Sequence, residues 1–199
     1  MPNWLKFPLV LTIVGCLSAV SLAGLYSLTA PVKKALAQKE TEQALKWVLP
    51  EAKEFIPIKD ASSNLPIYYQ AKNEAGKIIG YAVQGEAMGY AAPIIMMVGV
   101  DKEFKILGTK VLDQKETPGL GDKISEVLSK KTWKTVVSGT SPDERNLRPY
   151  FQIQFQGKQP PVALKQHGGD IEAITGATIS SKAVVDAINL AIKNLREVL

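Results

Sequence analysis

Residues 172–181, which read E-A-I-T-G-A-T-I-S-S, combine the side chains best suited to hold a phosphate group. Gly176 can adopt backbone angles closed to other residues and Ala177 adds little bulk, so a large group can approach the backbone. Ser180-Ser181 is the predicted N-cap of a long amphipathic helix. The hydroxyl of Thr178 should therefore lie before a helix N-terminus, where free N–H groups and the helix dipole favour a phosphate. The residues alone leave open a plain strand–turn–helix junction capped by hydroxyls.

Two further segments have the composition of ligand-binding loops. Residues 115–123 read K-E-T-P-G-L-G-D-K, in which the proline sets a turn while Gly119 and Gly121 permit close approach of a flat or anionic ligand. The spacing matches neither a Walker motif nor a full dinucleotide fingerprint, so a Pro/Gly surface turn is the alternative. Residues 89–94 read G-Y-A-A-P-I, and Tyr90 can either stack on a flat ring or pack in the core.

The three segments, in this order, resemble those of the FMN-binding domain family. Residues 172–178 resemble its flavinylation motif, D-x-x-S/T-G-A-T, whose last threonine carries FMN through a phosphoester bond. Residues 116–123 resemble the loop beside the flavin in the G subunits of Rnf-type complexes, and residues 89–94 resemble the family's G-Y-x-G-P-I segment. Two residues depart from the family pattern, because Glu172 stands where aspartate is usual and Ala92 replaces a glycine.

The resemblance implies an FMN bound covalently to Thr178. The residues that it places beside the flavin are Thr175, Gly176, Ala177, Glu116, Thr117, Gly119, Leu120, Gly121 and Tyr90. It implies neither a catalytic residue nor a metal site. Since the motif has no His or Lys before Lys182 to activate the threonine hydroxyl, a separate flavin transferase should attach FMN from FAD.

The implied function is electron transfer within a membrane complex of the Rnf type, as a redox subunit without complete activity of its own. Such a complex couples electron transfer between ferredoxin and NAD to movement of Na⁺ or H⁺, and its other membrane subunits carry further flavins and iron–sulfur centres. Three alternatives remain open. The chain could be the related C subunit of a sodium-pumping NADH:quinone oxidoreductase, a membrane-anchored FMN-binding or sensory module outside any pump, or a structural domain without a cofactor.

The composition of the 199-residue chain argues against several other classes of protein. Its single cysteine, Cys16, supports neither an intrachain disulfide nor an iron–sulfur cluster, and its single histidine, His167, rules out a His-rich metal site. The formal net charge is +5, but acidic residues are interspersed and no basic run carries aromatic residues. Binding of nucleic acid is therefore disfavoured.

Residues 7–30 contain no charged side chain over about 24 positions, which is long enough for a transmembrane helix. Candidate cleavage sites before Cys16 and at residues 21–23 are followed by more apolar sequence than a signal peptide has, so we expect an uncleaved single-pass anchor. Positive charges flank both ends and do not settle the orientation. The resemblance places the carboxyl-terminal domain on the extracytoplasmic side of the inner (cytoplasmic) membrane. The span has no ionisable group, so an ion path should lie in partner subunits.

The remaining sequence predicts one α+β domain, with helices packed on a twisted, mainly antiparallel sheet. The predicted organisation is a tail (1–6), the span (7–30), a linker (31–40) and the domain (41–199), whose flavin core covers residues 85–199. Predicted strands occupy residues 66–71, 77–84, 93–100, 105–112, 150–155 and the short stretch 171–174. Predicted helices occupy residues 41–48, 122–128 and 181–199.

Overall fold

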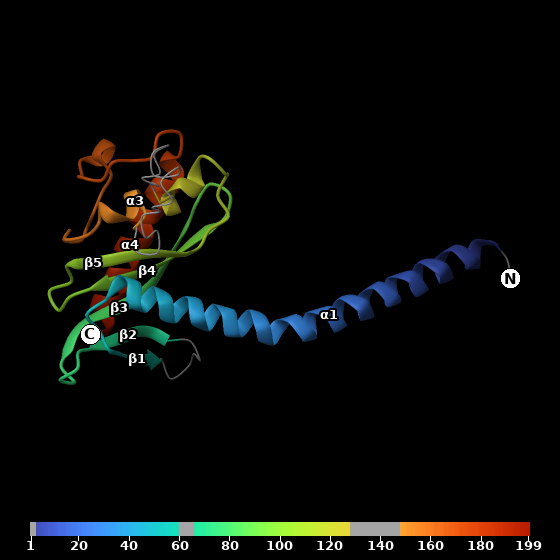
Figure 1. Cartoon of the computed structure of the whole chain (residues 1–199). Helices are drawn as coiled ribbons and strands as arrows, with labels where there is room; N and C mark the ends of the chain where they lie inside the picture. The colour runs from blue at the N-terminus through green and yellow to red at the C-terminus, as the bar shows by residue number, and fades with distance from the viewer. Residues whose placement is uncertain (1–2, 60–65, 128–147) are drawn as a thin grey trace, which may run out of the picture. The chain divides into compact units, whose positions relative to one another are not determined.

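The computed structural model describes residues 3–59, 66–127 and 148–199 (Figure 1). The chain divides into two compact units, Met1–Glu42 and Gln43–Leu199. The first unit is helical. The second unit contains a β-sheet with helices packed on it, and it carries every segment in which the sequence predicts ligand contacts.

Helix α1 (Asn3–Val48) makes up the first unit, and its last residues belong to the second. It includes an 18-residue stretch with a mean hydropathy of 2.1, which makes it long and apolar enough to cross a membrane. Three hydroxyls in the uncharged part of this helix, those of Thr12, Ser21 and Thr29, donate hydrogen bonds to the carbonyl oxygen four residues earlier. Hydroxyls whose hydrogen bonds are made within the helix can be placed in an apolar environment such as a membrane without losing a partner. Helix α1 thus covers the predicted span and continues through the predicted linker and the predicted helix over 41–48.

The second unit is built on a five-stranded antiparallel sheet in which consecutive strands are neighbours, in the order β1-β2-β3-β4-β5. Short connections join β2 to β3, β3 to β4 and β4 to β5, and each of these strands pairs with the next one along the chain. The four predicted strands between residues 66 and 112 are confirmed, with differences of a few residues at their ends. The strands are β1 (Glu54–Lys59), β2 (Pro66–Lys72), β3 (Ile78–Met88), β4 (Pro93–Val100) and β5 (Ile106–Asp113).

Strand β1 is the one strand of the described sheet that the sequence does not predict. Pro57 lies in its middle, and a proline argues against a central strand because it cannot donate a ladder hydrogen bond. In the structure β1 lies at the edge of the sheet and pairs with β2 alone, with Pro57 opposite Tyr69. A proline is tolerated at such an edge.

The prediction of a strand over residues 150–155 is wrong. The segment forms a short helix, α3 (Tyr150–Ile153), followed by a turn. Phe151 and Phe155 are fully buried, and their rings meet edge to face with centroids 5.5 Å apart. The alternation of aromatic and polar residues mimics a strand, but two phenylalanines four positions apart also lie on one face of a helix.

Two shorter predictions also need correction. The helix predicted over residues 122–128 is a 3-10 helix, η1 (Gly121–Ser125), and residue 128 lies outside the described residues. The strand predicted over residues 171–174 is reduced to a single bridge between Leu164 and Ile171. Between these two bridge partners lies a second 3-10 turn, η3 (Lys165–His167), which carries the exposed histidine.

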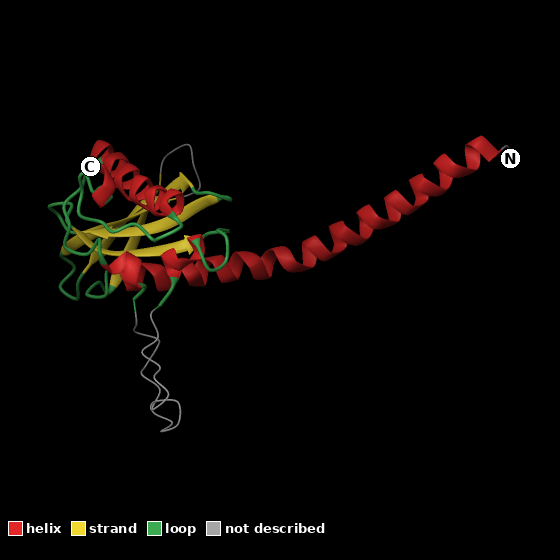
Figure 2. Ribbon diagram, turned by 90° about the horizontal axis from the view of Figure 1, so that it is seen from above, coloured by secondary structure: helices red, strands yellow, loops and turns green. Residues whose placement is uncertain are grey.

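Helices lie on both faces of the sheet, as Figure 2 shows. Helix α4 (Thr178–Val198) packs against β3 and β4 on one face, and the end of α1, from Gln43 onward, packs on the other. The largest group of buried side chains lies between the sheet and α4. It includes Val83, Met96, Val98 and Ile106 of the strands and Val184, Ile188, Ile192 and Leu195 of the helix.

Glycines in the strands allow both helices to rest directly on the sheet. A Cβ at Gly85 in β3 would lie 2.2 Å from the carbonyl oxygen of Ala187 in α4. On the other face Gly99 and Gly108 are paired across β4 and β5, and a Cβ at either would lie within 2.9 Å of the carbonyl oxygen of Val48. The sheet therefore fixes α4 at backbone contact, and with it the residues at the start of that helix.

The substitution Gly85→Val tests this close contact. The added side chain would overlap the α4 backbone, so we expect the free energy of unfolding to fall by about 1–3 kcal/mol. Thermal and denaturant unfolding of the detergent-solubilised chain would measure the loss. Glu86→Val is the matched control, because it places the same side chain one position along β3 at an exposed site. Equal stability of the two variants would contradict the contact.

Candidate functional site

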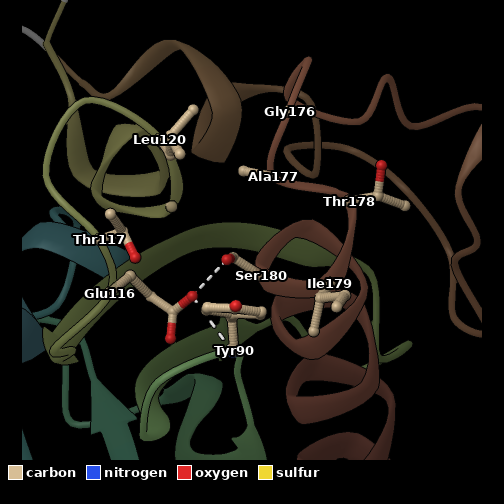
Figure 3. Close-up of a pocket in the computed structure, with 10 residues that line it drawn as sticks. Tyr90, Glu116, Thr117, Leu120, Gly176, Ala177, Thr178, Ile179 and Ser180 are labelled. Atoms are coloured by element: carbon tan, nitrogen blue, oxygen red, sulfur yellow. Dashed lines mark hydrogen bonds between the residues drawn. The ribbon is translucent and has the colours of Figure 1, made fainter.

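A cavity of about 570 Å³ lies where three segments of the second unit meet (Figure 3). The segments are the turn after β3, the loop that follows β5 and the start of α4. Eight of the ten predicted site residues line the cavity, whereas Gly119 and Thr175 do not. The lining residues are Tyr90, Glu116, Thr117, Leu120, Gly121, Gly176, Ala177, Thr178, Ile179 and Ser180.

The carboxylate of Glu116 links these three segments. This residue is only 5% exposed. One oxygen, Oε1, accepts a hydrogen bond from the N–H of Ala91 at 3.0 Å, and the other, Oε2, accepts one from the N–H of Tyr90 at 3.2 Å. Oε2 also accepts a hydrogen bond from the hydroxyl of Ser180 (Figure 3). The turn after β3 and the first turn of α4 are thus both bonded to the loop after β5.

Two glycines make room for this carboxylate. A Cβ at Gly89 would lie 2.5 Å from Oε1 of Glu116. A Cβ at Gly121 would lie 2.8 Å from Oε2 and 2.6 Å from the hydroxyl oxygen of Ser180. Gly121, which the sequence predicts to admit a ligand, lines the cavity and also packs closely against Glu116. Gly119 has no atom near its missing side chain, and its φ of +75° is the conformation that the turn requires.

Glu116 is ionised at neutral pH. Burial raises the pKa of this carboxyl, but the hydrogen bonds from Ser180 and from the N–H groups of Ala91, Tyr90 and Ala92 lower it by more. The net effect is a pKa below the ordinary value for glutamate. The cavity wall therefore carries one negative charge that is held by hydrogen bonds.

Helix α4 begins at Thr178, earlier than the sequence predicts, so Ser180 and Ser181 are not its N-cap. The N-cap residue is Ala177, which has no side-chain group to cap the first N–H groups. Ser181 instead accepts a hydrogen bond from the N–H of Ile174 and donates one to the carbonyl of Ala177, both at 2.9 Å. Helices leave their first N–H groups without intrahelical partners, so this uncapped terminus favours an anion.

The hydroxyls of the motif differ sharply in accessibility. Ser180 is 2% exposed and Ser181 is fully buried, and both take part in hydrogen bonds. Thr175 and Thr178 are exposed, but only Thr178 lines the cavity. Gly176, with a φ of +80°, sets the turn between the two threonines. Thr178 is therefore the hydroxyl of this stretch that is both accessible and next to the cavity.

Glu172, which stands at the first position of the motif, does not line the cavity. Its exposed carboxylate pairs with Lys165, and the hydrogen bond and the charge of that lysine hold its pKa below the ordinary value. The backbone of Glu172 is bonded twice to the side-chain amide of Gln154, at 2.8 Å through its N–H and at 3.2 Å through its carbonyl. The structure therefore assigns the motif's acidic residue to the surface of the loop before α4.

Sequence reasoning misses two cavity residues, Ile179 and Ser180. It assigns Ser180 to a helix cap because a serine before an amphipathic pattern is a strong capping signal. The actual partner of its hydroxyl is Glu116, 64 residues away, which no local pattern reveals. Ile179 is 55% exposed, and its hydrophobicity is the one signal that could have marked it, since exposed apolar side chains often line binding surfaces.

The substitution Glu116→Gln should destabilise the second unit more at neutral than at acidic pH. The pKa of Glu116 is lower in the folded chain than in the unfolded chain, so the ionised carboxylate stabilises the fold. This stabilisation is fully present above the ordinary glutamate pKa of about 4.3, and it is lost as the pH falls through the pKa of the folded chain. At pH 7 we expect a loss of about 1.5–3 kcal/mol, since the amide has only one acceptor oxygen and no charge for the donors that bond the carboxylate.

Denaturant unfolding over a series of pH values would measure this difference. Glu103→Gln, at an exposed position in the turn after β4, is the control that removes a surface carboxylate. A gap between wild type and Glu116→Gln that stays constant as the pH falls would contradict the assignment of a buried, ionised group.

Comparison with known proteins identifies relatives along most of the chain. A model of the FMN-binding domain family matches residues 89–193. The G subunit of the ion-translocating oxidoreductase complex of Methanosarcina acetivorans is 31% identical over 94% of this chain and 92% of its own length. The G subunit of the Na⁺-translocating ferredoxin:NAD⁺ oxidoreductase complex of Acetobacterium woodii is 29% identical over 94% of this chain and 89% of its own.

Solved structures of the C subunits of Na⁺-translocating NADH-quinone reductases are also similar. The Parabacteroides distasonis protein is 20% identical, with a TM-score of 0.46 over 80% of this chain and 94% of that one. The Shewanella oneidensis protein is 19% identical, with a TM-score of 0.44 over 72% of this chain and 66% of that one. The match of the family model and the similarity to the archaeal protein along nearly the whole chain together establish that this chain belongs to the FMN-binding domain family, among the G subunits of ion-translocating oxidoreductase complexes.

Proposed function

We propose that this chain carries FMN through a phosphoester bond to Thr178 and transfers electrons as one subunit of a membrane-bound, ion-translocating ferredoxin:NAD oxidoreductase complex. The observation that carries the proposal is the position of the Thr178 hydroxyl. It is exposed, it lines the cavity, and it belongs to the first residue of a helix that no side chain caps.

The residues of the cavity fit an FMN. A volume of about 570 Å³ lies within the range of cofactor sites, which is about 300–1,000 Å³. The side chains of Tyr90, Leu120 and Ile179 supply apolar surface for a flat ring, and the N-terminus of α4 supplies N–H groups for a phosphate. FMN supplies the redox chemistry, while the protein supplies position and electrostatics.

The described residues that line the cavity include no base placed to activate the Thr178 hydroxyl. Glu116 supplies the one carboxylate among the described residues that line the cavity. It accepts hydrogen bonds from the hydroxyl of Ser180 and from the backbone N–H groups of Tyr90 and Ala91, and none from Thr178 is found. An ordinary threonine hydroxyl is a weak nucleophile. A flavin transferase that transfers the FMN moiety of FAD is therefore the partner for maturation.

A covalent bond suits a site outside the cytoplasm, where a dissociated FMN would be lost by dilution. In this proposal residues 7–30 anchor the chain in the cytoplasmic membrane and residues 41–199 lie on the extracytoplasmic side. The apolar N-terminal helix supports membrane association. The partners are the other membrane subunits of the complex, which bear flavins and iron–sulfur centres and which provide the path for Na⁺ or H⁺.

The substitution Thr178→Val should abolish covalent flavin, because valine keeps the shape of threonine and lacks the hydroxyl. The chain would be produced together with its flavin transferase, and flavin would be followed by fluorescence of the denatured band and by the mass of the intact chain. Thr175→Val is the matched control and should retain the full flavin signal. Covalent flavin on the Thr178→Val chain, or a peptide map of the wild-type chain that finds the flavin on Thr175, would show that the flavin is attached to a residue other than Thr178.

Purification in mild detergent tests membership in a complex separately from flavin attachment. We expect the tagged chain to retain several polytopic membrane subunits and to retain them in the Thr178→Val variant as well, since the substitution is confined to one exposed side chain. A flavin-loaded chain that purifies alone from its native membrane would instead favour an FMN-binding module outside any pump.

A further inference from the structure

Among the residues that the structure describes, one charged side chain lines the cavity, and its charge is negative. Of the ten lining residues Glu116 is the only acid, and none is a lysine, arginine or histidine. None of the ion pairs found in the described part of the chain involves Glu116. The carboxylate is neutralised only in part, by the hydroxyl of Ser180 and by backbone dipoles.

Burial makes this charge effective over the width of the cavity. Glu116 is almost wholly shielded from solvent. A buried charge is screened far less by salt than a surface charge, and its interactions are stronger where the effective dielectric constant is low. Its position is also fixed, because Gly89 and Gly121 close around it on both sides.

We propose that the Glu116 carboxylate lowers the reduction potential of the FMN in this cavity, and that the hydrogen bond from Ser180 moderates this effect. The inference rests on the proposed function, because it concerns the cofactor carried by Thr178. Reduction of the ring by two electrons, with uptake of one proton from water, leaves it one unit more negative than before. A fixed negative charge beside it opposes that change.

The proposal predicts that substitutions at Glu116 and Ser180 shift the midpoint potential of the flavin in opposite directions. A purely structural role for these residues does not predict this difference. Glu116→Gln removes the charge and should make the midpoint potential more positive. Ser180→Ala removes a donor that draws negative charge density from the carboxylate, so the potential should become more negative. If the two residues only held the cavity together, both substitutions would loosen the same contact and move the potential in the same direction.

The experiment is a titration of the full-length, flavin-loaded chain with dithionite, which supplies the electrons and is oxidised to sulfite, in the presence of redox dyes. For Glu116→Gln we expect at least a tenfold change in the equilibrium constant, which is about 30 mV for a two-electron couple. Glu116→Asp keeps the negative charge, so its midpoint potential should be more negative than that of Glu116→Gln and closer to that of the wild type. Glu103→Gln should leave the potential unchanged, because it lies at the opposite end of β4 from the cavity.

Flavin content is measured first, by in-gel fluorescence and mass, so that the two proposals fail separately. A wild-type chain without flavin overturns the proposed function. A loaded chain in which Glu116→Gln leaves the potential unchanged or more negative, or in which Ser180→Ala makes it more positive, overturns only the role of Glu116. If Glu116→Gln fails to fold, the sign of the Ser180→Ala shift still decides the question.

Discussion

The cavity depends on one buried carboxylate that is shared by three segments of the chain. Glu116 belongs to the loop after β5, and its donors belong to the turn after β3 and to the first turn of α4. Its removal would leave several polar groups without their partner, and each buried polar group left unpaired costs about 1–3 kcal/mol. Gly89 and Gly121 are part of the same arrangement, because any side chain at either position would displace the carboxylate. The position of the Ser180 hydroxyl therefore joins the start of α4 to the rest of the cavity wall.

The sheet gives that helix its place. Helix α4 rests on β3 at backbone contact over Gly85, and its apolar side fills the main core with the side chains of β3 and β4. Thr178 itself is exposed, so its position is set by the buried residues of the helix rather than by contacts of its own side chain. A hydroxyl that is presented in this way is fixed in space and still open to another enzyme.

Retention and tuning of the cofactor are separate tasks in such a site. The charge at a helix N-terminus contributes only about 0.3–1 kcal/mol to holding a phosphate at an exposed position, which orients the group but cannot keep it. A covalent bond to Thr178 would keep it, leaving the cavity free to shape the environment of the ring. The apolar side chains of Tyr90, Leu120 and Ile179 and the single charge of Glu116 are the means by which this cavity can do so.

Features that depend on neighbours along the chain could be predicted from the sequence. Alternation of apolar residues and short turns predicted four strands, the uncharged N-terminal stretch predicted a helix long enough to span a membrane, and three motifs predicted eight of the ten residues that line the cavity.

Features that depend on partners distant in sequence are set by the tertiary structure. Ser180 was predicted as a helix cap and instead bonds Glu116, and the close packing of Gly121 against that carboxylate was not visible in the sequence. Residues 150–155 matched a strand pattern, but residues 150–153 form a short helix, and the rings of Phe151 and Phe155 pack against each other in the core. Local patterns report which conformations are favourable, whereas the choice among them is made by contacts that form only when the chain has folded.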